Sequence, residues 1–198
     1  MPAMMQSPVQ AADHSSNGLT DLYQEIIVEH SRRPRFKGRV EGCKFCQEGK
    51  NPLCGDQITI FCKINAAPEG VAPRLSAHFD GTGCSISQAS ASMMCDALQN
   101  VDVQKARAVL HHAESIYTGK KSIKNVDDVE EDIEALFGVS KFPVRIKCAA
   151  LAWKTLELLL NEHFDEEGNL KKATPEAGCG ELRACASVRK LKVVSTEI

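Results

Sequence analysis

Apolar residues along the chain first recur at helical spacing between residues 19 and 27, at positions i, i+3, i+4, i+7 and i+8. Thr20 suits the N-cap of such a helix and Pro34 cannot continue it, so the pattern predicts a helix over residues 20–32. The later helical patterns cover residues 87–100, 101–119, 129–138 and 144–163. The last of these has Pro143 at its first turn and apolar residues on two sides, which is typical of a central, buried helix.

Alternation of apolar and polar residues predicts two strands. β-Branched residues alternate over residues 57–64, and a second alternating run over residues 74–81 follows a turn, so the two are expected to pair in an antiparallel hairpin. Residues 35–56, rich in Gly, Lys and Cys, are predicted to be irregular, and a late strand over residues 190–195 has no second signal to support it. The order of one helix, then strands, then helices predicts an α+β fold with helices packed on a small antiparallel sheet.

The chain has 198 residues, enough for one domain with a single hydrophobic core. Residues 1–18 are small and polar without periodicity, so we expect a disordered N-terminal tail. The segments with clear periodicity lie within residues 19–163, which define the predicted domain. Over residues 164–198 the composition loosens, and this C-terminal extension is expected to be flexible.

Composition argues against several classes of protein. A formal net charge of −2 argues against nucleic-acid binding, which needs a strong basic excess. No run of 18 apolar residues is present to span a membrane, and the first 18 residues lack the basic and apolar regions of a signal peptide. A cytoplasmic location is therefore expected, and nine cysteines in such a protein indicate metal or sulfur chemistry rather than disulfides.

Three widely separated cysteines stand in settings that bear on metal binding. Cys54 and Asp56 flank a glycine, which allows a tight turn that can direct both side chains at one ion. Cys84 is expected where a strand gives way to a helix, and the positive end of a helix favours a thiolate there. Cys148 lies on the apolar stripe of the last predicted helix, a position typical of a core cysteine when taken alone. Together, three thiolates and one carboxylate can fill a tetrahedral zinc site or hold a small iron–sulfur cluster.

Around these cysteines the chain closely resembles the U-type iron–sulfur assembly proteins, the IscU/NifU-like family, and within it the SufU branch. The matching stretches are LYQEIIVEHSRRPRFKG (22–38), NPLCGD (51–56), FDGTGCSISQASASMM (79–94) and GVSKFPVRIKCAALAWKTLE (138–157). The resemblance implies an IscU/SufE-like fold, in which helices cover a three-stranded antiparallel sheet and the metal site lies at one exposed end. It also implies that the metal ligands are Cys54, Asp56, Cys84 and Cys148.

Several features favour the SufU branch over the IscU scaffolds. IscU-like proteins have a histidine immediately before the last ligand cysteine, where this chain has Lys147. They also have a Leu-Pro-Pro-Val-Lys peptide, where this chain has Lys-Phe-Pro-Val-Arg over residues 141–145. The long interval between Cys84 and Cys148 accommodates the extra region typical of SufU. Arg145 matches the arginine that family members place beside the metal, where a fixed cation can stabilise thiolates or a persulfide.

The resemblance implies a zinc-dependent sulfurtransferase that accepts persulfide sulfur from a SufS-type cysteine desulfurase and serves downstream Suf assembly proteins or apo iron–sulfur proteins. Cys54 is the expected acceptor because Gly55 makes its loop easy to move, and Cys148, on a rigid helix, is the rival. The first alternative is a scaffold, on which a [2Fe–2S] cluster takes the place of zinc and is assembled and passed on. The second alternative is a zinc-stabilised module that regulates a partner without accepting sulfur. Among these three functions, only the sulfurtransferase would be an enzyme.

The remaining cysteines fall into two groups. Cys62 and Cys95 lie among apolar residues at strand-like and helix-like positions, so they are predicted to be core residues. The others are a Cys-x-x-Cys pair just before the first ligand loop, which is a half-site without a second Cys-x-x-Cys, and two cysteines in the C-terminal extension. Together they could in principle complete a second site, but the spacing gives no support for one, so none is assigned a role. These four are Cys43, Cys46, Cys179 and Cys185.

Overall fold

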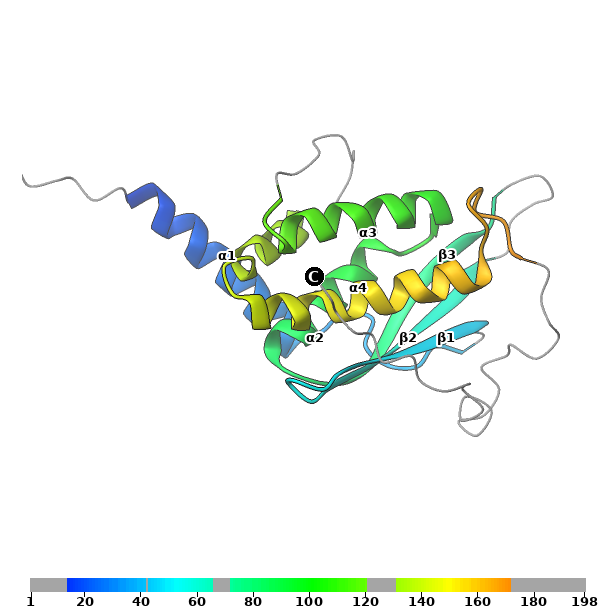
Figure 1. Cartoon of the computed structure of the whole chain (residues 1–198), viewed down its shortest axis with the longest axis horizontal. Helices are drawn as coiled ribbons and strands as arrows, with labels where there is room; N and C mark the ends of the chain where they lie inside the picture. Colours follow the sequence, from blue (N-terminus) through cyan, green and yellow to red (C-terminus); the bar gives the residue numbers. More distant parts are fainter. Residues whose placement is uncertain (1–13, 42, 66–71, 121–130, 172–198) are drawn as a thin grey trace, which may run out of the picture.

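The computed structural model describes residues 14–41, 43–65, 72–120 and 131–171, and Figure 1 shows how its elements are arranged. In chain order these are α1 (His14–Arg32), β1 (Phe45–Asn51), β2 (Asp56–Asn65), β3 (Arg74–Thr82), α2 (Ser85–Ala97), β4 (Val101–Asp102), α3 (Val103–Tyr117), the 3₁₀ helix η1 (Glu131–Val139) and α4 (Pro143–His163). Helices pack on one antiparallel sheet, so the predicted α+β class is confirmed.

The first helix starts earlier than the hydrophobic pattern predicts. α1 begins at His14 rather than at residue 20, so residues 14–18, which we expected in the tail, are helical in the structure. The polar residues of this stretch give no 3.6-residue hydrophobic pattern, and periodicity therefore could not reveal the extra helical residues. Residues 1–13, the rest of the predicted tail, lie outside the described residues.

The sheet has four antiparallel strands in the order β1-β2-β3-β4, so the prediction of three strands is wrong. β4 contributes two residues, which pair with Arg74 and Leu75 at the start of β3, and a strand this short shows no alternation in the sequence. β1 falls within the stretch predicted to be irregular. Its sequence, Phe-Cys-Gln-Glu-Gly-Lys-Asn, has none of the β-branched residues on which strand prediction relies.

Tertiary packing explains why this weak sequence forms a strand. β1 pairs with β2 along its whole length. α4 crosses β1 so closely that a Cβ atom on Gly49 would lie 2.0 Å from Oγ1 of Thr155. Glycine alone permits such an approach, so the residue that weakens the strand locally is also the one that lets the helix cover it.

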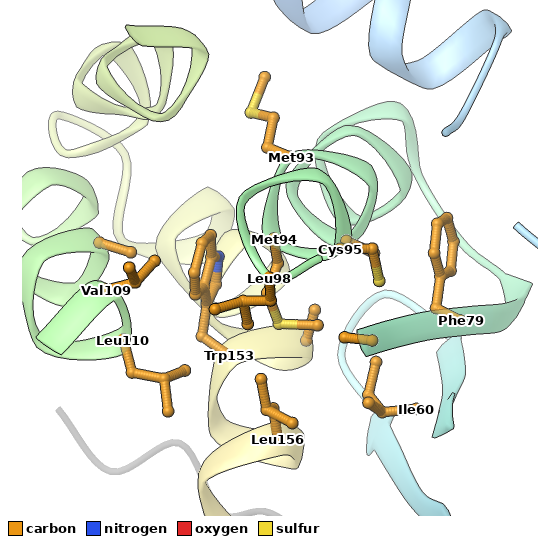
Figure 2. Packing of buried hydrophobic residues seen from close by; sticks show 14 of the residues in the cluster. Ile60, Phe79, Met93, Met94, Cys95, Leu98, Val109, Leu110, Trp153 and Leu156 are labelled. Carbon is orange, nitrogen blue, oxygen red and sulfur yellow. The ribbon is translucent and has the colours of Figure 1, made fainter. Parts of the chain in front are cut away.

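Helices α2 and α4 cover one face of the sheet, and α3 packs against α4 (Figure 1). The sheet residues on that face alternate with residues on the other face, so Ile60 and Cys62 of β2 are fully buried. Figure 2 shows Cys95 of α2 and Leu98, the C-cap of that helix, gathered with Trp153 of α4 and with Ile60 in this core. Both Cys62 and Cys95 are 0% exposed, which confirms their prediction as core residues.

The described structure continues past residue 163. Phe164 is buried, its ring lies edge-on to that of Phe45 with centroids 6.0 Å apart, and its backbone bridges to Leu170. The start of the predicted extension is thus packed on the domain. The boundaries themselves stay a prediction, because residues 172–198, including the proposed late strand, lie outside the described residues. Among the helices that the structure describes, none has the length and apolar character needed to cross a bilayer.

Candidate metal centre

The turn between β1 and β2 holds the first two predicted ligands. Asn51 ends β1 and pairs with Asp56, the first residue of β2, so residues 52–55 form the turn. The backbone oxygen of Asn51 accepts hydrogen bonds from the N–H groups of Cys54 at 3.3 Å and Gly55 at 2.9 Å. Gly55 has a φ of +71°, which residues with a side chain rarely adopt. The glycine between the two ligands is therefore required by the turn itself.

Asp56 is fully buried because strand alternation directs its side chain to the helix-covered face of the sheet. It continues the series of buried residues Ile58 and Ile60 on β2. Its Oδ1 atom accepts a hydrogen bond of 2.8 Å from the backbone N–H of Cys84. Gly83 leaves room for this contact, since a Cβ atom there would lie 2.8 Å from the same oxygen. The loop between β3 and α2 thus fixes one carboxylate oxygen and leaves Oδ2 to the side chains around it.

Cys84 is the N-cap of α2, which confirms the predicted junction of strand and helix. Its sulfur accepts a hydrogen bond of 3.4 Å from the backbone N–H of Ser87 and lies 4.0 Å from Oδ2 of Asp56. Negative charge at this position interacts favourably with the positive end of the helix.

Cys148 lies in the second turn of α4 and is 3% exposed. Two hydrogen bonds join α4 to α2 beside it. The hydroxyl of Ser90 donates to the backbone oxygen of Ala149 at 2.7 Å, and the indole N–H of Trp153 donates to the Ser90 hydroxyl at 2.7 Å. With α4 held in this position, the sulfur of Cys148 lies 3.2 Å from the sulfur of Cys54.

The pKa of the Cys148 thiol is raised well above its ordinary value, first by burial and then by hydrogen bonding to Cys54 and Asp56. Without a compensating cation this buried sulfur stays protonated. A bound dication reverses the preference, because a coordinating thiol is deprotonated outright. Two or three sulfurs with one carboxylate suit a thiophilic cation such as Zn²⁺ far better than a hard cation such as Mg²⁺.

One ligand atom each from Cys54, Asp56 and Cys148 lies within 4.8 Å of the other two. Zinc bonds of about 2.3 Å to sulfur and about 2.1 Å to oxygen place tetrahedral neighbours roughly 3.6–3.8 Å apart. The sulfur–sulfur contact of 3.2 Å and the 4.0 Å contact of Asp56 with Cys84 lie on either side of that range. The structure therefore gathers three predicted ligands and places Cys84 next to them, and these residues fit zinc. Their assignment as metal ligands stays a prediction.

Arg145, predicted to lie beside the metal, is exposed on α4 one turn before Cys148. Its guanidinium carbon lies 4.4 Å from the centroid of the Phe142 ring, a geometry that holds the cation at the start of the helix. Its contact with a thiolate or persulfide stays a prediction. Cys43 and Cys46 are partly buried at the start of β1.

Asn51 is a residue of the site that the sequence analysis does not single out. Its side chain is buried, and its Nδ2 atom lies 3.5 Å from both Oδ2 of Asp56 and the sulfur of Cys148. Its pairing with Asp56 could have revealed it, because directly paired residues on neighbouring strands face the same side of a sheet. This pairing can be deduced only after residues 45–51 are recognised as a strand.

Comparison with known proteins shows the family of the chain. The chain matches the family model described as the NifU-like N-terminal domain over residues 22–168. The chain belongs to this family. It is 42% identical over 139 residues to the zinc-dependent sulfurtransferase SufU of Bacillus subtilis (strain 168), and the match covers 70% of this chain and 89% of that protein. It is 33% identical over 142 residues to the iron–sulfur cluster assembly scaffold protein IscU of Thermotoga maritima, covering 71% of this chain and 94% of that protein.

Solved structures share the fold. A crystal structure from Fervidobacterium islandicum AW-1, of a protein described as an iron–sulfur cluster assembly scaffold for the SUF system, has a TM-score of 0.59 and 33% sequence identity. The match covers 68% of this chain and 93% of that chain. The resemblance to IscU/NifU-like proteins inferred from the motifs, with SufU among the relatives, is thereby confirmed.

Proposed function

We propose that this chain is an iron–sulfur cluster assembly protein that binds zinc and accepts persulfide sulfur from a SufS-type cysteine desulfurase. The observation behind the proposal is the 3.2 Å contact between the sulfurs of Cys54 and Cys148, beside the buried carboxylate of Asp56 and at an exposed turn. The names of the relatives from Bacillus subtilis and Thermotoga maritima support a role in this process, and the first of them supports sulfur transfer.

The proposed ligands differ in how firmly the fold holds them. A zinc ion bound by them would keep the thiolates deprotonated near neutral pH and has no redox chemistry of its own. Asp56 is held by the loop that precedes α2, and Cys148 lies on a helix joined to α2 by the Ser90 hydrogen bonds. Cys54 is exposed on a turn next to Gly55. Cys54 is therefore the sulfur best placed to swing toward a partner, and we propose it as the acceptor, with Cys148 as the rival.

In the proposed transfer the Cys54 thiolate attacks the outer sulfur of the desulfurase persulfide. A sulfur–sulfur bond forms at Cys54 while the one in the partner breaks, and the partner cysteine leaves as a thiolate. One persulfide and one thiolate are present before and after the step, so no external oxidant or reductant is needed. The exposed guanidinium of Arg145 is proposed to stabilise the negative charge of the persulfide at this surface.

Exposed apolar side chains beside the site suit the docking of a protein partner. Leu53, directly before Cys54, is 66% exposed, and Val144, one turn before Cys148 on α4, is 58% exposed. Phe142, the N-cap of the same helix, is exposed as well. Apolar groups that gather at one exposed place mark interaction surfaces. A desulfurase docked here would bring its persulfide to Cys54 while it excludes water from the exchange.

The proposal is tested by transfer of ³⁵S from cysteine through a purified SufS-type desulfurase. The Cys54→Ala and Cys148→Ala variants are expected to lose stimulation of the desulfurase and to acquire no label. Cys95→Ala is the matched control, because it removes a buried thiol from the core, and it is expected to behave as the wild type. Equal stimulation and labelling in all three variants would contradict the assignment.

The names of the IscU relatives favour a second candidate, a scaffold that receives a [2Fe–2S] cluster as cargo and passes it to apo-proteins. The same side chains would hold that cargo. Anaerobic purification followed by metal analysis and an optical spectrum separates the two candidates. Colourless protein with one zinc per chain supports the sulfurtransferase, whereas brown protein with iron and sulfide supports the scaffold.

A further inference from the structure

We propose that Asn51 is a positioning residue of the metal site, whose side-chain amide holds the Asp56 carboxylate and the Cys148 sulfur in the arrangement that binds metal. The inference rests on the proposed metal-binding function and adds a residue outside the four predicted ligands. Asn51 is the last residue of β1 and is 4% exposed. A buried side-chain amide this close to two predicted ligands needs a defined orientation, and the neighbouring residues fix that orientation.

The backbone of the turn fixes which end of the amide faces the site. The Oδ1 atom of Asn51 accepts a hydrogen bond of 3.3 Å from the backbone N–H of Leu53. This is the Asx-turn arrangement, in which an Asn side chain bonds to the backbone two residues further on. An amide oxygen accepts and an amide nitrogen donates, so the Leu53 contact directs the two N–H bonds of Nδ2 away from the turn.

The amide nitrogen faces two predicted ligands that come from different elements. Nδ2 lies 3.5 Å from Oδ2 of Asp56 on β2 and 3.5 Å from the sulfur of Cys148 on α4. An N–H···S contact of this length is ordinary because sulfur is large, while the contact with the carboxylate is longer than the usual N–H···O range of about 2.7–3.2 Å and is the weaker of the two. Since the amide has two hydrogens, it can serve both acceptors at once. The amide thus bridges the two predicted ligands without adding a charge to the site.

The same residue also positions the sulfur on the turn. The backbone oxygen of Asn51 accepts the N–H groups of Cys54 and Gly55, which closes the loop that presents the Cys54 thiol. Asn51 therefore acts on three predicted ligands, one through its backbone and two through its amide. Groups that orient metal ligands in this way typically change metal affinity 10–100-fold when they are removed.

The test compares Asn51→Ser with the wild type. Serine keeps the backbone bonds and can replace the amide oxygen as the acceptor for Leu53, but it is too short to reach Cys148. Zinc affinity is measured by competition with a chromophoric chelator at fixed pH, and the ligand geometry by the optical spectrum of the Co²⁺-substituted protein. We expect zinc to bind about 10–100-fold more weakly. We also expect changes in the thiolate-to-cobalt bands.

A matched control is available at the far end of the same sheet. Asn65 ends β2, is partly buried, and donates its amide to Ser76 and Asn100. Asn65→Ser makes the same chemical change without touching a predicted ligand, and it should leave both the zinc affinity and the cobalt spectrum unchanged. Zinc affinity of Asn51→Ser within threefold of the wild type, together with an unchanged cobalt spectrum, overturns the proposal.

A second measurement covers the case in which Asn51→Ser does not fold. In the zinc-loaded wild type, the side-chain amide protons of Asn51 should exchange with solvent far more slowly than those of the exposed Asn161, as followed by NMR. Equal exchange rates overturn the proposal. None of these measurements involves a desulfurase, so weak zinc binding by Asn51→Ser supports the role of Asn51 even if the wild type transfers no sulfur. A wild type that binds no metal overturns both proposals.

Discussion

The core pair Cys62 and Cys95 and the site pair Cys54 and Cys148 show two uses of the same side chain in one domain. Cys62 and Cys95 are fully buried, and burial raises the pKa of the Cys95 thiol well above its ordinary range. Cys148 is nearly as buried, and burial is also the main reason that its pKa is raised. Burial and an elevated pKa therefore do not distinguish a candidate ligand from a core residue.

The two environments differ in the atoms that the sulfurs face. Cys95 lies in the apolar core with Ile60 and Phe79 (Figure 2), and the thiol of Cys62 is near enough to contribute to its raised pKa. Cys148 also has a second sulfur nearby, that of Cys54, but in addition it faces the Asp56 carboxylate and the Asn51 amide, which lie at the ends of β2 and β1 that meet at the turn. A candidate metal site is thus recognised by converging polar donors at the edge of the core, and a single thiol gives little information.

Zinc binding should give the largest difference between the two cysteine pairs, because it should stabilise the protein through Cys54 and Cys148 and not through the core pair. Free zinc at 1,000 times its Kd would stabilise the native state by about 4 kcal/mol. For a domain of this size that corresponds to a rise in Tm of roughly 8–16 °C, measured by calorimetry with zinc and with EDTA. The wild type and Cys95→Ala should both show the rise, and the double variant Cys54→Ser, Cys148→Ser should not. A rise of equal size in the double variant would place the metal elsewhere.

A hydroxyl should be tolerated differently in the two environments. Cys95→Ser puts a polar group into the apolar core and is expected to lower the free energy of unfolding by about 2 kcal/mol. Cys148→Ser should cost less in the metal-free protein, because the amide of Asn51 and the thiol of Cys54 are there to pair with it. Urea denaturation of the metal-free variants measures both costs. Equal costs would show that the two environments do not differ as described.

The core thiol should also make stability depend on pH. The pKa of Cys95 is raised in the folded state above its reference value of 9.0, so its stabilising contribution is complete below pH 9 and is lost as the pH rises. Above pH 9 the thiol ionises more readily in the unfolded chain than in the folded one, so folding becomes less favourable as the pH rises. Between pH 7 and pH 10 the metal-free wild type should therefore lose more stability than Cys95→Ala in urea titrations. Parallel pH profiles would contradict this.

The smallest expected effect concerns the turn of the site. Gly55 has a φ of +71° and open space around it, so Gly55→Ala adds backbone strain of about 1 kcal/mol without a steric clash. Amide hydrogen exchange should become faster near Cys54 and remain unchanged at Cys95. If Cys54 moves to accept sulfur, as proposed, its transfer rate should change with this substitution. Uniformly faster exchange across the core would mean that the turn and the core are not independent.

Local signals in the sequence predicted much of the fold and named the candidate ligands. The helical periodicity of α3 and α4 and the alternation of β2 and β3 come from neighbouring residues, so they can be recognised without knowing the fold. The same holds for the motifs around Cys54 and Cys84, which led to the family. The four-stranded sheet and the full length of α1 could not be found in this way, because β1, β4 and the start of α1 have no periodic pattern of their own.

By itself, the sequence determined the periodic parts of the α-helices, the central hairpin, the family and the residue types suited to a soft metal ion. Only the tertiary structure decided which of these segments and side chains lie next to one another. The approach of α4 to Gly49 makes β1 a strand and turns Asn51 inward, and the Ser90 hydrogen bonds hold the helix that brings Cys148 to Cys54. These contacts join residues that are far apart in the chain. Local periodicity shows which face of a segment is buried, but it contains no information about which distant segment covers that face.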